Sequence, residues 1–167
     1  MAGPTRRIFG CRCQLREVTN PMEIWTIGYE KAAQSDVIAA LTRAGITTVL
    51  DVRDRPQSRR AGFSKSSLAA SLLAAGIGYV HLKPLGTPKE GRVAHHSGDQ
   101  ATFWRIVDEQ LATDAAGQAL EEVAARARAE RCCLLCYEAD WRHCHRARIV
   151  EKLGSDAHHL EAVASFL

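Results

Sequence analysis

Short apolar runs alternate along this chain with longer stretches in which apolar positions recur every three or four residues. The short runs, which include many β-branched residues, predict buried strands over residues 23–27, 47–52, 77–82, 132–137 and 157–160. The longer stretches predict helices, one capped by Ser35 and ended by Gly45, one capped by Ser64 and ended by Gly76, and others over residues 100–112, 114–130 and 142–153. Residues 83–99 are rich in Pro, Gly and His and predict a long loop.

The alternation of strands and helices predicts a three-layer α/β/α fold, Rossmann-like, around a mainly parallel sheet of about five strands. Because crossovers between parallel strands are right-handed, the loops after the first four strands should meet at one edge of the sheet. These loops, residues 28–29, 51–53, 81–86 and 138–146, are among the most polar and glycine-rich parts of the chain. Since open α/β sheets bind ligands at the carboxyl ends of their strands, we expect one site at this rim.

Charge is distributed unevenly over the 167 residues, which suffice for one domain with a substantial core. Residues 1–21 hold four arginines and one glutamate, and so the whole net charge of +3, whereas residues 22–167 hold 18 basic and 18 acidic side chains. We expect residues 1–21 to be a flexible basic extension, or the product of an upstream start with Met22 as the true first residue. We expect residues 22–167 to form a single α/β domain. Its neutrality argues against duplex nucleic acid as a partner, because duplex binding needs many cations on one face.

The chain has six cysteines, and three of them, Cys132, Cys133 and Cys136, lie in or beside one apolar run. In a chain that is neither small nor loop-rich, this pattern favours free thiols over a disulfide framework, so we expect a reducing compartment, the cytoplasm. No apolar run approaches the roughly 18 to 20 residues that a membrane span needs, so no membrane partner is expected.

Arginines gather after the second predicted strand, where Asp51 and Arg53 are followed by Arg55, Arg59 and Arg60. The forked donors of a guanidinium group suit phosphate or carboxylate, so we expect Arg53, together with Asp51, at an anion-binding site. The alternative is structural, with Asp51 pairing with an arginine while the other arginines are solvated.

The ends of the first and third strands supply further candidates for the anion site. Thr26 and Gly28 lie where the first strand meets its helix, and a glycine there lets a ligand approach the backbone closely. The chain has neither a G-x-G-x-x-G fingerprint nor a G-K-[ST] phosphate loop, so a dinucleotide site is unsupported. His81 ends the third strand, and Tyr29 can either stack on a base or pack in the core.

Cys136 and Glu138 are the candidate catalytic residues, because they stand two positions apart at the end of the fourth strand and should face the same side. A thiol near a helix amino end and cationic neighbours is acidified and nucleophilic, and a carboxyl group there can act as a general acid or base. A carboxylate at a buried rim needs a partner, for which we expect Arg53 or Arg146. Alternatively, Cys136 is a small buried apolar residue.

Cys144, His145 and Arg146 open the last predicted helix, and we add them to the anion site because helix amino ends attract anions. Cys136, Cys144 and His145 also carry the thiol and imidazole groups that bind zinc, but a structural zinc site generally shows two close pairs of ligands. Cys133 and Cys136 form a C-x-x-C pair, yet their odd spacing in a strand should turn them to opposite faces. The sequence therefore favours no metal site.

Several short motifs occur together in this chain. They are Thr26-Ile27-Gly28-Tyr29, Asp51-Val52-Arg53 with Pro56 and Ser58, Tyr79-Val80-His81-Leu82 with Leu85-Gly86, Leu135-Cys136-Tyr137-Glu138 with Cys144-His145-Arg146, and His159-Leu160. In this combination, over roughly residues 22–161, the chain resembles the domain of unknown function 488 family. The resemblance implies an α/β fold and no established activity. Lys83-Pro84 and the segment before Met22 depart from the family pattern.

Taken together, these features favour a cytoplasmic protein that binds a small phosphorylated or nucleotide-like anion at the rim and hydrolyses it or transfers a group from it. One alternative is a non-enzymatic module that senses a ligand or is stabilised by zinc. Another is a protein that processes single-stranded nucleic acid through the arginine loop, Tyr29 and Trp141. The sequence identifies no cofactor and leaves the oligomeric state open.

Overall fold

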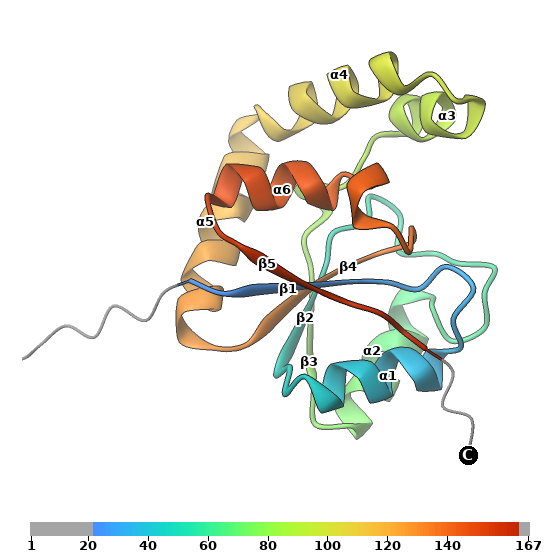
Figure 1. Cartoon of the computed structure of the whole chain (residues 1–167), viewed down its shortest axis with the longest axis vertical. Helices are drawn as coiled ribbons and strands as arrows, with labels where there is room; N and C mark the ends of the chain where they lie inside the picture. The colour runs from blue at the N-terminus through green and yellow to red at the C-terminus, as the bar shows by residue number, and fades with distance from the viewer. Residues whose placement is uncertain (1–21, 164–167) are drawn as a thin grey trace, which may run out of the picture.

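The computed structural model describes residues 22–163, in which one parallel sheet of five strands lies between two layers of helices (Figure 1). The predicted three-layer α/β fold is therefore confirmed. Residues 1–21, predicted to be a basic extension or the product of an upstream start, lie outside the described part, as do residues 164–167. Among the described residues, no helix combines the length and apolar character needed to cross a membrane.

The strands lie within the apolar runs of the sequence, and the three central strands are buried along their whole length, whereas the two edge strands are partly exposed. The strands are β1 (Ile24–Gly28), β2 (Thr48–Asp51), β3 (Gly78–His81), β4 (Cys132–Cys136) and β5 (Ala157–Leu160). Their spatial order is β3-β2-β4-β1-β5, and all neighbours run parallel. Gly28 pairs with Cys136, and Asp51 pairs with both Leu135 and His81, so the carboxyl ends of four strands meet at one edge.

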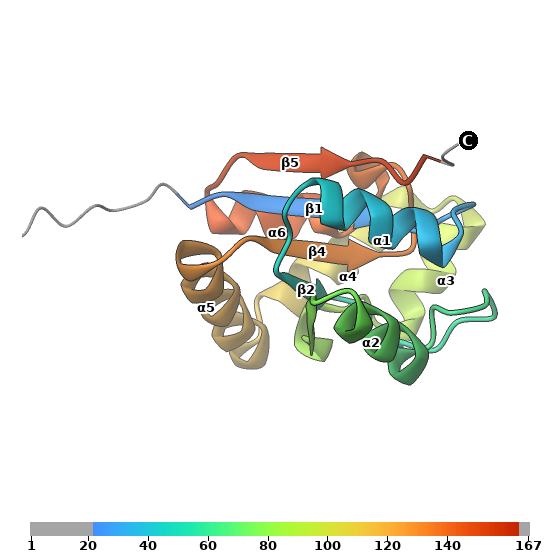
Figure 2. The same ribbon diagram turned by 90° about the horizontal axis from the view of Figure 1, so that it is seen from below.

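One face of the sheet is covered by α1 (Gln34–Arg43) and α2 (Lys65–Ala74), which lie in front of the strands in Figure 2. Their apolar side chains, including Val37 and Leu68, pack against Ile27, Cys133 and Leu135. Burial of apolar surface on this face stabilises both helices against the sheet.

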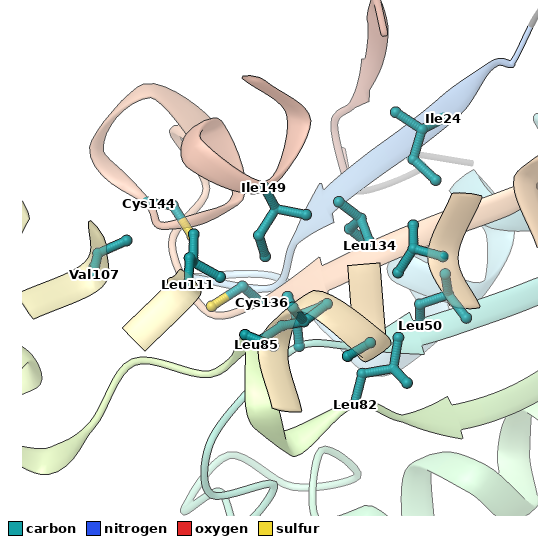
Figure 3. Packing of buried hydrophobic residues seen from close by; sticks show 14 of the residues in the cluster. Ile24, Leu50, Leu82, Leu85, Val107, Leu111, Leu134, Cys136, Cys144 and Ile149 are labelled. Carbon is teal, nitrogen blue, oxygen red and sulfur yellow. The ribbon is translucent and has the colours of Figure 1, made fainter. Parts of the chain in front are cut away.

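The opposite face is covered by α4 (Gln100–Leu111), α5 (Asp114–Ala129) and α6 (Arg146–Leu153). Helix α3 (Lys89–Ser97) lies on the same side and packs on α4. Figure 3 shows the core of this face, in which Cys136 and Cys144 lie between Val107 and Ile149. Cys133 and Cys136 thus belong to the cores on opposite faces, which confirms the expectation from their spacing.

The predicted long loop over residues 83–99 is wrong. This stretch contains a 3-10 turn, η1 (Lys83–Leu85), and the whole of α3, which packs on α4. Helix α3 has a largely polar sequence and buries only small residues, Gly91 and Ala94, so it lacks the apolar stripe by which amphipathic helices are recognised. It ends at Gly98, whose φ of +83° is readily adopted by glycine.

Two predicted helix starts are also wrong. Helix α1 begins at Gln34 after Ala33, so Ser35 lies inside it rather than capping it. Helix α6 begins at Arg146 instead of residue 142, because a separate 3-10 turn, η2 (Trp141–His143), precedes it. Asp140 caps that turn by accepting a hydrogen bond from the backbone N–H of Arg142. As a result, Cys144 has an extended backbone and lies before α6.

Candidate functional site

A cavity of about 550 Å³ opens at the edge where the carboxyl ends of the strands meet. Its wall combines Tyr29 after β1, residues 53–60 after β2, residues 87–96 in the segment after β3, and Glu138 and His145 after β4. The predicted convergence of four loops at one rim is confirmed. Cavities of this size commonly hold small-molecule ligands.

Arg53 lines the cavity, but most of its donors are already occupied. Its Nε and Nη2 atoms donate to the two carboxylate oxygens of Asp51 at 2.8 and 2.6 Å. Its Nη1 donates to the hydroxyl of Tyr29 and to the carbonyl of Phe63 at 2.8 and 2.9 Å. A guanidinium group has five N–H donors, so one remains for a ligand. The structural pairing of Asp51 with an arginine is therefore present.

The buried environment of this ion pair shifts the pKa values of two groups. Burial disfavours the charge on Arg53, but the hydrogen bonds and charge of Asp51 outweigh that cost and raise the pKa of the guanidinium group. The hydroxyl of Tyr79 donates to Asp51 at 2.6 Å, and burial together with that hydrogen bond raises its pKa. Arg53 thus stays charged and fixed in place at neutral pH.

Four predicted site residues, Thr26, Gly28, Asp51 and His81, support the cavity from behind and are not part of its lining. The imidazole Nε2 of His81 lies 2.8 Å from the carbonyl oxygen of Arg53, and the hydroxyl of Thr26 lies 2.7 Å from Nδ1 of His159. Gly28 gives space to the carbonyl of Glu138, because a Cβ atom there would lie 1.9 Å from that oxygen. Their predicted contact with an anion stays a prediction.

The cavity wall carries more positive than negative side chains. Arg92 is neutralised by Asp54 at 2.6 Å. In contrast, Arg55, Arg59 and Arg60 form no ion pair with any carboxylate of residues 22–163. These three arginines, which we call the loop arginines, give one wall an uncompensated positive charge.

Buried polar atoms without partners also concentrate at the cavity. Within residues 22–163, four buried side-chain polar atoms lack a hydrogen-bond partner, and three of them belong to lining residues: Nε of Arg60, Oγ1 of Thr87 and Nδ1 of His95. Buried polar atoms are almost always hydrogen-bonded in folded proteins, so three residues of the cavity wall each keep a polar atom that residues 22–163 leave without a partner.

Glu138 lies at the floor of the cavity with its side chain 24% exposed. Its carboxylate contacts the thiol of Cys136 at 3.4 Å and Nε2 of His95 at 3.8 Å. The expectation that an arginine would pair with this carboxylate is wrong, because Arg146 donates instead to the backbone carbonyl of Glu138. Burial, followed by the nearby charge of Cys144, raises the pKa of Glu138 to about 7.

The two thiols near Glu138 differ in exposure and in acidity. Cys136 lines the cavity, whereas Cys144 is 1% exposed and lies behind the floor with Arg146. A hydrogen bond between Cys136 and Cys144, together with burial, raises the pKa of Cys136. Burial opposes ionisation of Cys144, but that hydrogen bond and the Arg146 charge hold the Cys144 pKa well below its usual value. The lowered pKa thus belongs to Cys144, which also accepts a hydrogen bond from Nε of Arg146 at 3.2 Å, and the catalytic role expected for Cys136 stays a prediction.

Sequence reasoning assigned no role at this cavity to Thr87 and Arg92, and took His95 and His96 for residues of a loop. All four fall in the stretch predicted to be a loop. A usable signal was the spacing of Arg92, His95 and His96, which places the three side chains on one face if the segment is helical.

The two aromatic residues considered for base stacking pack against protein groups. The ring of Tyr29 stacks on Phe63, with centroids 4.2 Å apart, and Tyr29 is 3% exposed. The ring of Trp141 stacks on His159 at 3.8 Å. At least one face of each ring is therefore covered by a protein side chain.

The comparisons with known proteins gave one match. A family model described as "Domain of unknown function DUF488" matches residues 34–153, which include α1 to α6 and every lining residue except Tyr29. Neither the search of curated proteins nor that of solved structures produced a match.

Proposed function

This chain belongs to the DUF488 family, and we propose that it binds a small phosphorylated or nucleotide-like anion in the rim cavity and hydrolyses it or transfers a group from it. The observation that carries the proposal is the pairing of unneutralised loop arginines with unpartnered buried polar atoms around one cavity. An anion with several oxygens would complement both features, since phosphate oxygens accept bidentate bonds from guanidinium groups.

The position of Glu138 supports a chemical step in addition to binding. Its carboxyl group lines the same cavity as the loop arginines and contacts a thiol and an imidazole. A carboxyl group in that position can give a proton to a leaving group or take one from water or another nucleophile. We infer that Glu138 is the reactive group and that Cys136 is its hydrogen-bonding neighbour.

The environment of the thiols supports a reducing compartment, such as the cytoplasm. The four cysteines of the described residues, Cys132, Cys133, Cys136 and Cys144, are buried free thiols. A single-stranded nucleic acid is less well supported as the ligand, because Tyr29 and Trp141 already stack on protein side chains.

Titration calorimetry of the full chain with inorganic phosphate, ribose 5-phosphate and nucleoside monophosphates tests the binding step. We expect at least one of these probes to bind, and the double variant Arg55→Gln/Arg59→Gln to bind it at least tenfold more weakly. Arg43→Gln, at an exposed position in the last turn of α1 and outside the cavity, is the matched control and should bind like wild type.

Two results would contradict the binding proposal: no probe binds the wild-type chain, or the double variant binds as tightly as the control. The chemical step is tested with Glu138→Gln, which retains size and hydrogen bonding but cannot ionise. We expect this variant to bind the probe and to lose turnover of a substrate that carries the same group. Full turnover by Glu138→Gln would remove Glu138 from the reaction.

A further inference from the structure

Three atoms of the kind that bind zinc converge at the floor of the cavity. The Sγ atoms of Cys136 and Cys144 and the Nδ1 atom of His145 all lie within 4.8 Å of one another. The two sulfur-to-nitrogen distances are 3.8 and 3.7 Å. In a tetrahedral zinc site with bonds of about 2.3 Å to sulfur and about 2.0 Å to nitrogen, these ligands stand about 3.6 Å apart. The cluster therefore has nearly the spacing that a bound ion requires.

The ring of His145 is oriented by a separate contact. Its Nε2 atom lies 2.9 Å from the backbone carbonyl of Val52, which can only accept a hydrogen bond. Nε2 must therefore carry the hydrogen, and the lone pair of a neutral ring is then on Nδ1, which faces both thiols. Metal-binding histidines usually have their other ring nitrogen fixed in this way by a carbonyl or carboxylate.

Arg146 supports the cluster electrostatically. Its Nε donates to Cys144 Sγ at 3.2 Å, and its side chain is 1% exposed. A buried guanidinium group at this position favours the thiolate form of Cys144, which is the form that binds a metal. It also fixes the position of Cys144 Sγ, because a thiolate sulfur has several lone pairs and can accept this hydrogen bond while it binds a metal.

The fourth position of such a site would face the cavity. Cys136 and His145 both line the cavity, whereas Cys144 is buried and is not part of the lining (Figure 3 shows the two sulfur atoms). Glu138, whose Oε2 atom is 3.4 Å from Cys136 Sγ, lines the same cavity. Three protein ligands with one position open to a cavity is the arrangement of catalytic zinc sites.

We propose that Cys136, Cys144 and His145 bind a thiophilic divalent metal such as Zn²⁺, with its open position directed toward the anion cavity. Both sulfur atoms bind as thiolates, any remaining thiol proton is released to solvent, and the imidazole binds in its neutral form. The metal site stands on the cluster alone, whereas a direct contact between metal and anion rests on the proposed function.

The test is cobalt(II) loading of the full chain, purified under reducing conditions, followed by absorption spectroscopy and elemental analysis. We expect about one cobalt per chain with thiolate-to-cobalt charge-transfer bands. Cys136→Ser and Cys144→Ser should each weaken cobalt binding at least tenfold. Cys132→Ala, which removes a buried thiol of the same strand outside the cluster, should bind like wild type.

The serine variants can lose metal because they unfold, so a second measurement uses only the wild-type chain. Zinc should raise the thermal unfolding temperature of the wild-type chain, and a chelator should reverse the shift. The metal site is wrong if wild-type chains hold fewer than about 0.1 equivalents of zinc or cobalt after reconstitution, or if binding persists in Cys144→Ser. Formation of a Cys136–Cys144 disulfide by chains that bind no metal would also overturn it.

Phosphate separates this inference from the proposed function. Addition of inorganic phosphate to the cobalt-loaded chain should shift the d–d bands of the cobalt if the open position faces a bound anion. Cobalt binding without any such shift refutes the direct contact and leaves a structural metal site. Phosphate binding to the chelator-treated chain reports on the anion cavity alone.

Discussion

Removal of the carboxylate of Asp51 should destabilise this protein far more than the loss of a typical ion pair. Asp51 is fully buried and holds Arg53 through two hydrogen bonds, and it also accepts the hydroxyl hydrogen of Tyr79. In Asp51→Ala the guanidinium group stays buried, at 6% exposure, without its counter-charge. Folding must then bear the cost of a desolvated charge as well as the loss of the bonds.

The size of this effect follows from the burial of both partners. Breaking a buried ion pair by removing one partner costs about 3–5 kcal/mol. Since domains of this size are stable by about 5–15 kcal/mol, the variant should lose a large part of its stability. The matched control is Glu109→Ala, which breaks the Arg105–Glu109 pair on α4, whose side chains are 59% and 63% exposed. Exposed pairs of this kind contribute about 0.2–1 kcal/mol.

Urea unfolding followed by circular dichroism measures the difference. We expect Asp51→Ala to unfold at a much lower urea concentration than wild type, with an unchanged slope of unfolding free energy against urea. The unfolding midpoint of Glu109→Ala should shift only slightly. The double variant Asp51→Ala/Arg53→Ala should lose less than the sum of the two single variants, because removing both charges avoids the unpaired one. If Asp51→Ala lies within about 1 kcal/mol of wild type, or if the two losses add, the pair does not act as argued.

Two further predictions concern backbone space and pH. Gly28→Ala should cost about 1–3 kcal/mol or more in urea unfolding, because its Cβ atom would overlap the Glu138 carbonyl. Gly117→Ala in α5, where a Cβ atom meets nothing within 4 Å, should instead stabilise the chain by about 0.5–1 kcal/mol, and a loss at both glycines would refute the overlap as the cause. The hydrogen bond from Thr48 lowers the pKa of Glu130 in the folded protein. This adds stability at pH values above the pKa of the unfolded chain, about 4.3, and the added stability is lost as the pH falls through the folded pKa. Thr48→Val should therefore cost about 1 kcal/mol at neutral pH and much less at about pH 3, whereas a loss that is equal at both pH values would contradict the linkage.

The sheet could be predicted from sequence because its strands are short apolar runs separated by helical patterns. The alternation rule also placed Cys133 and Cys136 on opposite faces. Helix α3 could not be found in this way, since it is held by the close contact of Gly91 and Ala94 with its neighbours rather than by large apolar residues.

The details of the site depend on contacts that are distant in sequence. The donors of Arg53 are filled by Tyr29 and by the carbonyl of Phe63, and neither contact leaves a local pattern. Likewise, His145 is oriented by the carbonyl of Val52, 93 positions earlier. The sequence could nominate these residues by chemical type and strand end, but their orientation follows only from the packed fold.

The place of β1 in the sheet also determines when the protein can fold during synthesis. Trp25 pairs with Cys133, and Thr26 pairs with His159, 133 positions later. During synthesis β1 therefore leaves the ribosome well before its partners β4 and β5, with five residues exposed that are buried in the final structure. Such distant pairing slows folding and lengthens the period in which a nascent chain can aggregate. The cavity also forms late, because its floor is built by the end of β4 and the loop that follows.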